Sequence, residues 1–385
     1  MSITIQDIDF HRVRNVRNAE AWLANFIARS SDVARYIMVS DDPFAPSKGK
    51  PNLEAVDMLE MVSDLVTKDA TLKQHPKVSI PHSTEVLKPV TKPSEGEFKE
   101  ETKVAMRRTV SILQKYEAPF VLNIMPFDLL QQMKMDISFA FFSNNSDPTS
   151  SIIVRDANHT YTNVFDFWYD TCTHALRKMG AGDLEIVVGK VGWPTDGAPG
   201  ATPENAAMFY RGLLNKINEG TPLNKKPINV YLETLIDENF FRSPIPTSRH
   251  MGIFKIDGTP KFEIDFTGQG RNITLLPDNR ITYLPTRYCI YNGTEVPKIQ
   301  KGFAEKWINA ACRFGDCSPI EAGSCSNLSE AMKLSYALNL LYQISGQSKC
   351  TFDSLGSIVY RDRSPSTAKC VFPVALIGFT VEKTQ

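Results

Sequence analysis

The feature that most constrains the fold is an alternation of short apolar segments with amphipathic ones over residues 3–236. The apolar segments are short and continuous, which is typical of strands that are buried on both faces of a sheet. The amphipathic segments between them have the spacing of surface helices. An α/β fold with a parallel sheet is therefore expected. The predicted strands are residues 2–7, 35–40, 77–80, 119–125, 184–189 and 229–236.

The number of predicted strands leaves two architectures open. A closed barrel of this kind needs eight strand–helix units, and the sequence supplies six. Either the sheet is open, or two units are absent from the chain. The first residues, MSITIQDIDFHRVRN, also lack the basic start, apolar centre and cleavage site of a secretory signal. We prefer the second alternative and expect the N-terminus to be incomplete.

The cysteines indicate a second, different region near the C-terminus. Six of the seven lie between Cys289 and Cys370, and Cys172 stands alone. Such a density is typical of a disulfide framework formed in an oxidising compartment, although the sequence alone leaves fifteen pairings open. Acceptor triplets for N-linked glycans agree with secretion. They begin at Asn144, Asn158, Asn272, Asn292 and Asn327.

Charge and motif content exclude several classes of partner. Lys and Arg total 43 and Asp and Glu total 43, so nothing points to nucleic acid or to an anionic membrane. No run of 18 apolar residues predicts a membrane span. We find no cluster with metal-ligand spacing and no phosphate loop, so we expect neither a metal nor a cofactor. We expect a monomer.

Six motifs then stand in order along the chain: FVLNIMPF (120–127), ISFAFF (137–142), YTNVFDFWYD (161–170), VVGKVGWPTDG (187–197), YLETLIDEN (231–239) and RHMGIFKIDGTPKF (249–262). Together they resemble the plant-type endo-β-1,3-glucanases of glycoside hydrolase family 17. The tail carries YCIYNG, ACRFGDCSPIEAGSC, SYALNLLYQ and KCVFP. It resembles the small cysteine-rich carbohydrate-binding module that follows many of these enzymes.

The resemblance implies a (β/α)8 TIM barrel of the glycoside hydrolase type, with its active site at the carboxyl ends of the strands. SITIQD would be the third strand, so the first two strand–helix units would be missing. The implied domains are the barrel at 1–265, a linker at 266–286 and a small, disulfide-rich, mainly helical module at 287–380. The implied disulfides are Cys289–Cys350, Cys312–Cys317 and Cys325–Cys370.

The resemblance also implies two catalytic glutamates, and both positions are substituted here. In retaining glycosidases the two carboxylates lie about 5–5.5 Å apart, one as acid and one as nucleophile. The acid belongs to a Gly-Asn-Glu-Pro-Phe pattern, where VSDDPF places Asp41 and Asp42 at the Asn and Glu positions. The nucleophile belongs to a Gly-Glu-Val-Gly-Trp-Pro pattern, where GKVGWP places Lys190.

These substitutions affect the chemistry unequally. The Asp42 carboxyl is one methylene shorter than that of Glu, which withdraws the proton donor from the glycosidic oxygen. An ammonium group at Lys190 cannot attack an oxocarbenium-like transition state and repels it. We expect Lys190 to pair with Asp41 or Asp42 across the barrel mouth as a structural ion pair. Taken alone, Lys190 is more often a solvated loop residue, and Asp42 a turn residue before Pro43.

Further residues match positions of the substrate cleft. Asn123, Phe127 and Trp193 are expected to shape a groove, with core packing as the alternative for the two aromatic rings. Glu238 matches a carboxylate at the end of the last strand, and we expect it to form hydrogen bonds rather than replace the nucleophile. Met125 and Met251 stand where the resemblance implies Tyr and Trp, so aromatic or hydroxyl groups are lost from the cleft motifs.

The tail offers its own aromatic residues. Tyr360 lies in a loop-like stretch and is the best candidate for sugar contact. Trp307 and Tyr336 lie on helical segments at core-like spacing, so packing is expected for them. Tyr342 is a further candidate.

We interpret the chain as a catalytically impaired homologue of a glucan endo-1,3-β-glucosidase that binds β-1,3-glucan in the plant cell wall. Two alternatives remain. The chain could be an active retaining endo-β-1,3-glucanase with displaced catalytic groups. It could also be a truncated gene product without function.

Overall fold

The computed structural model describes residues 2–5, 19–22, 34–69, 72, 75–142, 152–237, 245–267, 275–277, 282–297, 301–362, 364 and 369–377. The chain divides into two compact units, the first of residues 1–191 and 212–232 and the second of residues 192–211 and 233–385. The predicted domains at 1–265, 266–286 and 287–380 divide the chain differently, and they stay a prediction.

The first unit is built on parallel strands. They are β1 (Ser2–Ile5), β2 (Tyr36–Val39) and β3 (Lys77–Ser79) in one sheet, and β4 (Pro81–Ser83), β5 (Phe120–Asn123), β8 (Ile186–Val191) and β9 (Val230–Leu232) in the next. All neighbouring pairs run parallel. Only Ile80 separates β3 from β4, so the described residues provide strands at all six predicted places. The predicted parallel α/β architecture is confirmed.

The strands curve around a buried interior. Tyr36 and Met38 of β2 pack with Val121 of β5 and Val187 of β8, and all four side chains are buried. Tyr231 of β9 joins them, and its ring lies edge-on to that of Tyr36, with 5.8 Å between the two ring centres. Strands that are not neighbours can share such a cluster only if the sheet bends, as the strands of a barrel do.

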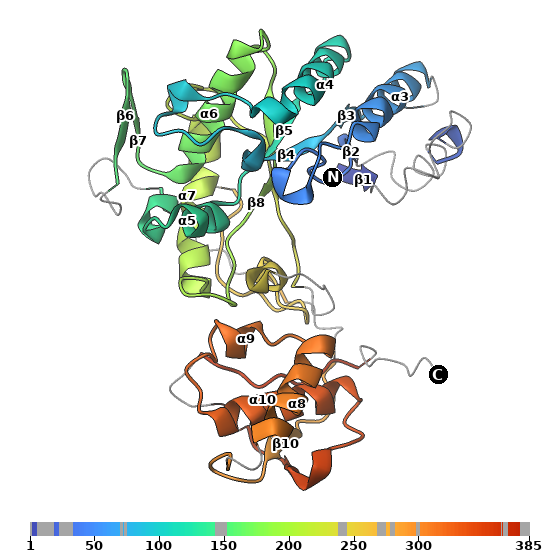
Figure 1. Cartoon of the computed structure of the whole chain (residues 1–385), viewed down its shortest axis with the longest axis vertical. Coiled ribbons are helices and arrows are strands. Elements are labelled where there is room, and N and C mark those ends of the chain that lie inside the picture. Colours follow the sequence, from blue (N-terminus) through green and yellow to red (C-terminus); the bar gives the residue numbers. More distant parts are fainter. Residues whose placement is uncertain are drawn as a thin grey trace. The chain divides into compact units, whose positions relative to one another are not determined.

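Amphipathic helices cover the strands of the first unit (Figure 1). On α3, the buried residues Val56, Leu59, Val62 and Val66 recur at helical spacing and face the strands. Asn163 caps α6 by accepting a hydrogen bond from the backbone of Asp166 at 2.8 Å. The helices are α3 (Glu54–Lys68), α4 (Lys103–Lys115), α5 (Pro126–Met133), α6 (Val164–Lys178) and α7 (Pro203–Glu219). Residues of α7 belong to both units. An antiparallel hairpin of β6 (Val154–Asp156) and β7 (His159–Tyr161) precedes α6.

The second unit contains the cysteine-rich module. Its helices are α8 (Lys301–Phe314), α9 (Ser318–Glu321) and α10 (Glu330–Ile344), and β10 (Tyr288–Tyr291) pairs antiparallel with β11 (Gly356–Val359). Three disulfides close it, in the pairing that the resemblance implies: Cys289–Cys350, Cys312–Cys317 and Cys325–Cys370. Cys172 is a buried free thiol in the first unit.

The aromatic residues of the module differ in how far their side chains are buried. Tyr336 and Tyr342 are buried between its helices, as expected for the first. Trp307 packs edge-on against Phe352 and donates from its indole nitrogen to Asp353 at 3.2 Å. Tyr360 is 71% exposed, with the Arg287 guanidinium 5.9 Å from its ring centre. A flat ligand could therefore reach the Tyr360 ring from solvent.

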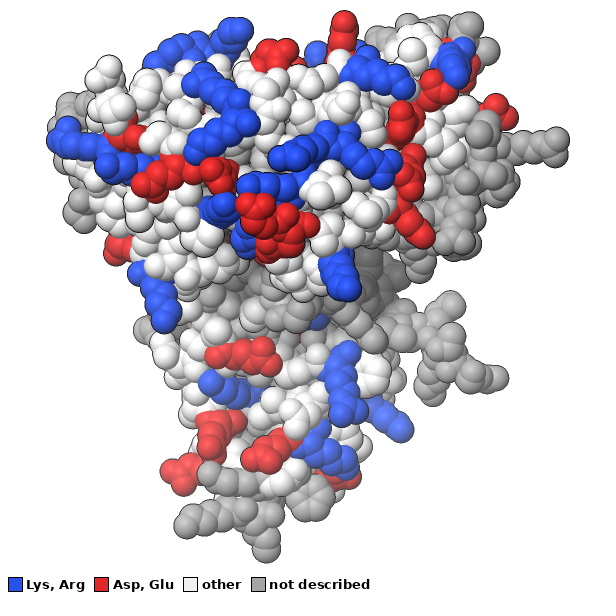
Figure 2. Space-filling view, turned by 45° about the horizontal axis from the view of Figure 1, so that its top comes forward, with Lys and Arg blue, Asp and Glu red and all other residues white. Residues whose placement is uncertain are grey.

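Charges of both signs are interspersed on the face of the molecule shown in Figure 2. Several are paired, as in Lys88 with Glu97 at 2.6 Å and Arg108 with Asp57 at 2.7 Å. Such a surface offers no large field of one sign to a polyanion. Within the described ranges, no helix is both long and apolar enough to span a bilayer.

A histidine lies in the core of the first unit. His82 of β4 is fully buried between Phe44 and Phe120, whose ring centres lie 5.1 and 5.0 Å away. Neither ring nitrogen has a hydrogen-bond partner among the described residues. Burial in this apolar sandwich disfavours the imidazolium and lowers the pKa of His82 to about 3.

We predict that His82 makes the first unit sensitive to acid. In the unfolded chain the imidazole binds a proton near pH 6.5, but in the folded chain only near pH 3. The unfolded state therefore gains stability as the pH falls below 6.5, by on the order of 3 kcal/mol at pH 4. His82→Phe should lose less melting temperature between pH 7 and pH 4 than the unmodified chain. His159→Phe, at a less buried site on β7, should lose as much melting temperature over this pH range as the unmodified chain. Equal acid sensitivity in all three proteins would contradict the assignment.

Candidate functional site

Polar side chains gather where four of the parallel strands end. Asp41 and Asp42 follow β2, Ser83 ends β4, Asn123 ends β5, and Lys190 is the penultimate residue of β8. Parallel strands bring their carboxyl ends to one edge of a sheet, which is where α/β barrels carry their chemistry. We refer to this edge as the strand-end site.

An ion pair joins the two sides of the strand-end site. The Lys190 ammonium lies 3.1 Å from Asp41 Oδ1, and the two side chains are 37% and 41% exposed. The Lys48 ammonium donates to the backbone carbonyl of Asp41, which also ties that loop in place. Of the two aspartates that the sequence offered as partners of Lys190, the structure pairs it with Asp41.

A local irregularity of β8 directs Lys190 into the site. Leu122 of β5 pairs with Val188 and Asn123 pairs with Lys190, so Gly189 is an extra residue in β8. A Cβ atom on Gly189 would lie 2.5 Å from the Val121 side chain and 2.7 Å from Asn123 Oδ1. No larger residue fits there without movement of β5. Bulges of this kind re-aim neighbouring side chains at active sites.

Asp42 has an environment unlike that of Asp41. Its side chain is buried, and its Oδ1 accepts a hydrogen bond from the backbone of Ser83 at 2.9 Å. Its backbone is left-handed, with φ of 55°, a conformation that Asp tolerates better than most residues. Burial raises the pKa of Asp42, and the hydrogen bonds from Ser83 oppose that rise. The hydrogen bond from Ser83 thus holds the Asp42 carboxyl group in position at the end of β4.

The other predicted site residues are placed as follows. Asn123 is buried beside Gly189 and next to Lys190 in the strand register. Phe127, in the first turn of α5, is 1% exposed, and Trp193 is fully buried against Phe209 in the second unit. This burial favours core packing, the alternative left open for both rings, and their place in a groove stays a prediction.

Glu238 and Tyr360 are the remaining predicted site residues. Glu238 falls outside the described residues, so its predicted role stays a prediction. Tyr360 belongs to the second unit. Met251 is buried there, and Met125 is the N-cap residue directly before α5.

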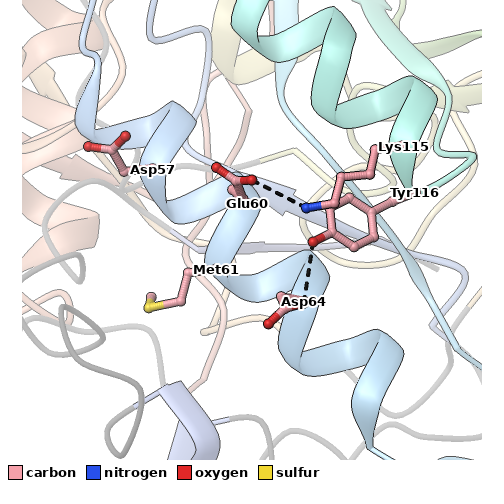
Figure 3. Close-up of a pocket in the computed structure, with 6 residues that line it drawn as sticks. All are labelled: Asp57, Glu60, Met61, Asp64, Lys115 and Tyr116. Carbon is pink, nitrogen blue, oxygen red and sulfur yellow. Dashed lines mark hydrogen bonds and ion pairs between the residues drawn. The ribbon is translucent and has the colours of Figure 1, made fainter.

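A separate hollow lies between α3 and α4 and has a volume of 390 Å³ (Figure 3). Lys115 pairs with Glu60 at 3.4 Å, and the Tyr116 hydroxyl donates to Asp64 at 3.4 Å. Lys77, the first residue of β3, donates to the Tyr116 carbonyl, so the hollow lies near the amino ends of the strands. It is open and ion-paired, and we do not regard it as the catalytic site.

Comparison with known proteins agrees with this geometry. The family described as glycosyl hydrolases family 17 matches residues 3–266. The chain belongs to this family. Two relatives from Arabidopsis thaliana, glucan endo-1,3-β-glucosidases 8 and 5, are 35% and 34% identical over 355 and 376 residues. The alignments cover 89% and 94% of this chain, and 71% and 75% of those relatives.

Solved structures lead to the same fold. A β-1,3-glucanase and allergen of Cryptomeria japonica pollen, CJP38, superposes with a TM-score of 0.63 at 25% identity, over 69% of this chain and 83% of its own. Plant β-glucan endohydrolases with distinct substrate specificities give a TM-score of 0.61 at 27% identity over the same shares. The first unit thus has the TIM-barrel fold of family 17.

The sequence did not identify three residues that shape this family 17 site. Ser83 fixes Asp42, Gly189 allows the bulge, and Lys48 holds the Asp41 carbonyl. A hydroxyl residue three positions after the predicted strand 77–80, and a glycine directly before Lys190, were the available signals. Neither signal specifies a contact between distant segments, so only the fold reveals these roles.

We predict that Gly189→Ala destabilises the barrel and disturbs Lys190. The added methyl group would overlap Val121 and Asn123, and overpacking of this kind costs about 1–3 kcal/mol. Thermal unfolding measures the loss. Gly302→Ala on α8 is the matched control, because nothing lies within 4 Å of its added Cβ and alanine favours helix. Equal stability of Gly189→Ala and the unmodified chain would show that the close contact is absent.

Proposed function

We propose that this family 17 chain binds β-1,3-glucan and is impaired in its hydrolysis. The observation that carries the proposal is the ion pair between Lys190 and Asp41 at the carboxyl end of β8. The family match and the Arabidopsis relatives support β-1,3-glucan as the ligand. The position of Lys190 in GKVGWP supports the impairment.

The chemistry of retention explains why this pair is incompatible with efficient turnover. One carboxyl must protonate the leaving oxygen while a second attacks the anomeric carbon and forms a covalent intermediate. At position 190 an ammonium replaces the attacking carboxylate, and the adjacent Asp41 carboxylate is engaged with it. Positive charge at this place opposes the positive charge that develops on the sugar ring.

The position of the general acid is better preserved than that of the nucleophile. Asp42 is buried, its pKa is raised, and Ser83 orients it. A raised pKa favours the protonated form that general acid catalysis needs. This observation favours the second candidate function, an active endo-β-1,3-glucanase, but it supplies only one of the two groups that retention requires.

The cysteine-rich module is the proposed second site of glucan contact. Tyr360, whose ring is exposed, is the best candidate for glucan contact in the module. The side chains of Trp307, Tyr336 and Tyr342 take part in packing. Three disulfides support an oxidising, extracellular location such as the cell wall. β-1,3-Glucan of the wall is then the proposed partner.

We predict that three substitutions together restore hydrolysis of laminarin. Lys190→Glu supplies the attacking carboxylate, and Asp42→Glu returns the missing methylene. Asp41→Asn is also needed, since Asp41 now lies 3.1 Å from the Lys190 ammonium. Two carboxylates that close would compete for one proton, and the pKa of one would rise. Release of reducing sugar should increase at least about 100-fold over the unmodified chain.

The matched control for this experiment is the same triple variant with Lys190→Gln in place of Lys190→Glu. It removes the ammonium without supplying a nucleophile, so it should remain inactive. The variant with Asp42→Glu and Lys190→Glu but unmodified Asp41 should be intermediate. Turnover of laminarin by the unmodified chain above a buffer blank would overturn the proposed impairment.

We predict that Tyr360→Ala weakens binding of the full chain to insoluble β-1,3-glucan by about tenfold, which corresponds to about 1.4 kcal/mol. Loss of an exposed aromatic ring removes the flat apolar surface on which a sugar ring can lie. Tyr360→Phe retains that ring and should bind like the unmodified chain. Depletion from solution by the polysaccharide measures the affinity. Indistinguishable depletion of the alanine variant would exclude Tyr360 from the contact.

A further inference from the structure

The hairpin of β6 and β7 carries an unusually accessible asparagine. Arg155 pairs with Thr160 and Asp156 with His159, so Ala157 and Asn158 form the two-residue connection at the tip. Ala157 has φ of 49°, as tight turns require. The hairpin projects from the body of the first unit (Figure 1). Asn158 is thereby held away from the core of that unit.

The polar groups of this tip are available for chemistry. Asn158 and Thr160 are both exposed, and within the described residues neither side chain forms a hydrogen bond. Together with His159 they form an Asn-x-Thr triplet, the acceptor sequence for N-linked glycans. Because Asn158 lies in the exposed turn directly before β7, a bulky sugar on its amide would extend into solvent.

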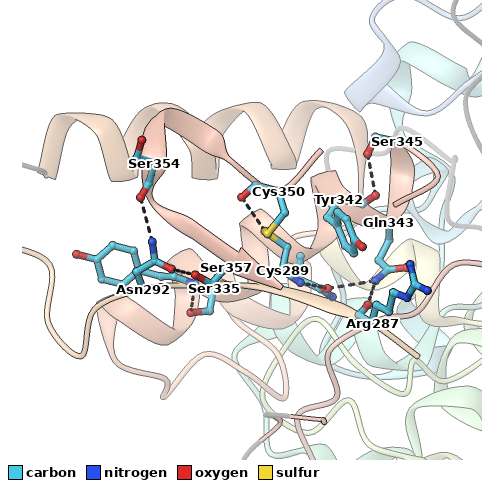
Figure 4. The surroundings of a disulfide bond; sticks show 12 residues. Arg287, Cys289, Asn292, Ser335, Tyr342, Gln343, Ser345, Cys350, Ser354 and Ser357 are labelled. Carbon is cyan, nitrogen blue, oxygen red and sulfur yellow. Dashed lines mark hydrogen bonds between the residues drawn. A yellow bond between two sulfur atoms is a disulfide. The ribbon is translucent and has the colours of Figure 1, made fainter. Parts of the chain in front are cut away.

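Asn292 begins another triplet in the described residues and is also exposed, but its side chain is hydrogen-bonded. Asn292 lies between Ser354 and Ser357 in the cysteine-rich module (Figure 4). Its amide nitrogen donates to the Ser354 carbonyl at 3.0 Å, and its amide oxygen accepts from the Ser357 hydroxyl. A sugar attached to that nitrogen would disturb its hydrogen bond to the Ser354 carbonyl.

We propose that Asn158 carries an N-linked glycan in the folded protein and that Asn292 does not. In the transfer, the Asn158 amide nitrogen forms a bond to C1 of a lipid-diphosphate-linked oligosaccharide. The bond between C1 and the phosphate oxygen breaks, the lipid diphosphate leaves, and the amide loses one proton. The site rests on the proposed extracellular location, because only the secretory route supplies this donor.

The glycan has a structural use at this position. A two-stranded hairpin has unpaired edges, and such edges are templates for association with other chains. Ile153, directly before β6, adds an apolar side chain that is 48% exposed. A hydrated oligosaccharide at the tip would keep other chains away from both features.

The test uses the full chain expressed behind an added secretion leader in plant cells. Peptide mapping by mass spectrometry after enzymatic removal of N-glycans in heavy-oxygen water reports each asparagine separately. We expect the deamidation label on Asn158 in most copies and no label on Asn292. Asn158→Gln and Thr160→Ala should abolish the glycan at this place, whereas Thr160→Ser, which keeps a hydroxyl, should retain it.

Secreted protein with an unlabelled Asn158, or with a labelled Asn292, would overturn the inference. Because the leader imposes secretion, such a failure concerns the site itself and leaves the proposed glucan binding untouched. Thermal unfolding of Asn158→Gln and Thr160→Ala should match that of Thr160→Ser. Equal melting temperatures would show that the glycan is lost because its acceptor is removed and not because the protein misfolds.

Discussion

The ion pair between Lys190 and Asp41 is the interaction on which the functional account depends. It bridges the carboxyl ends of β2 and β8, which are separated by β3, β4 and β5 in the strand order. Both side chains are partly exposed, so the pair contributes little to stability, on the order of 1 kcal/mol or less. Its importance is chemical, because it places positive charge where a retaining glycosidase needs a nucleophile.

The surrounding structure favours this arrangement without being specific for lysine. The bulge at Gly189 depends on a missing Cβ and on the close approach of Val121 and Asn123. It would direct a carboxylate at position 190 into the same place. Ser83 likewise holds the carboxyl group of Asp42 by a hydrogen bond from its backbone. A fold can thus keep its scaffold while the chemistry at its site changes, so function has to be argued from the site residues.

Much of this could be predicted from the sequence, and the limits have physical causes. Buried parallel strands leave continuous apolar segments, which is why all six strand positions were predicted. Ordered motifs identified the family and, with it, the disulfide pairing and the positions of Asp42 and Lys190. The burial of Phe127 and Trp193 was not predicted, because an aromatic residue in a motif has the same sequence signature in a core as in a groove. The choice of Asp41 over Asp42 depends on a hydrogen bond from Ser83, 41 residues away.

Trapping of the covalent intermediate tests the central claim most directly. A 2-fluoro-substituted β-1,3-linked glycosyl fluoride reacts with the nucleophile of a retaining glycosidase and leaves the sugar attached to it. Intact mass spectrometry of the unmodified chain after incubation with this reagent should show the mass of the protein alone. An added glycosyl mass on any carboxylate of the strand-end site would contradict the account, since it would reveal a nucleophile other than residue 190.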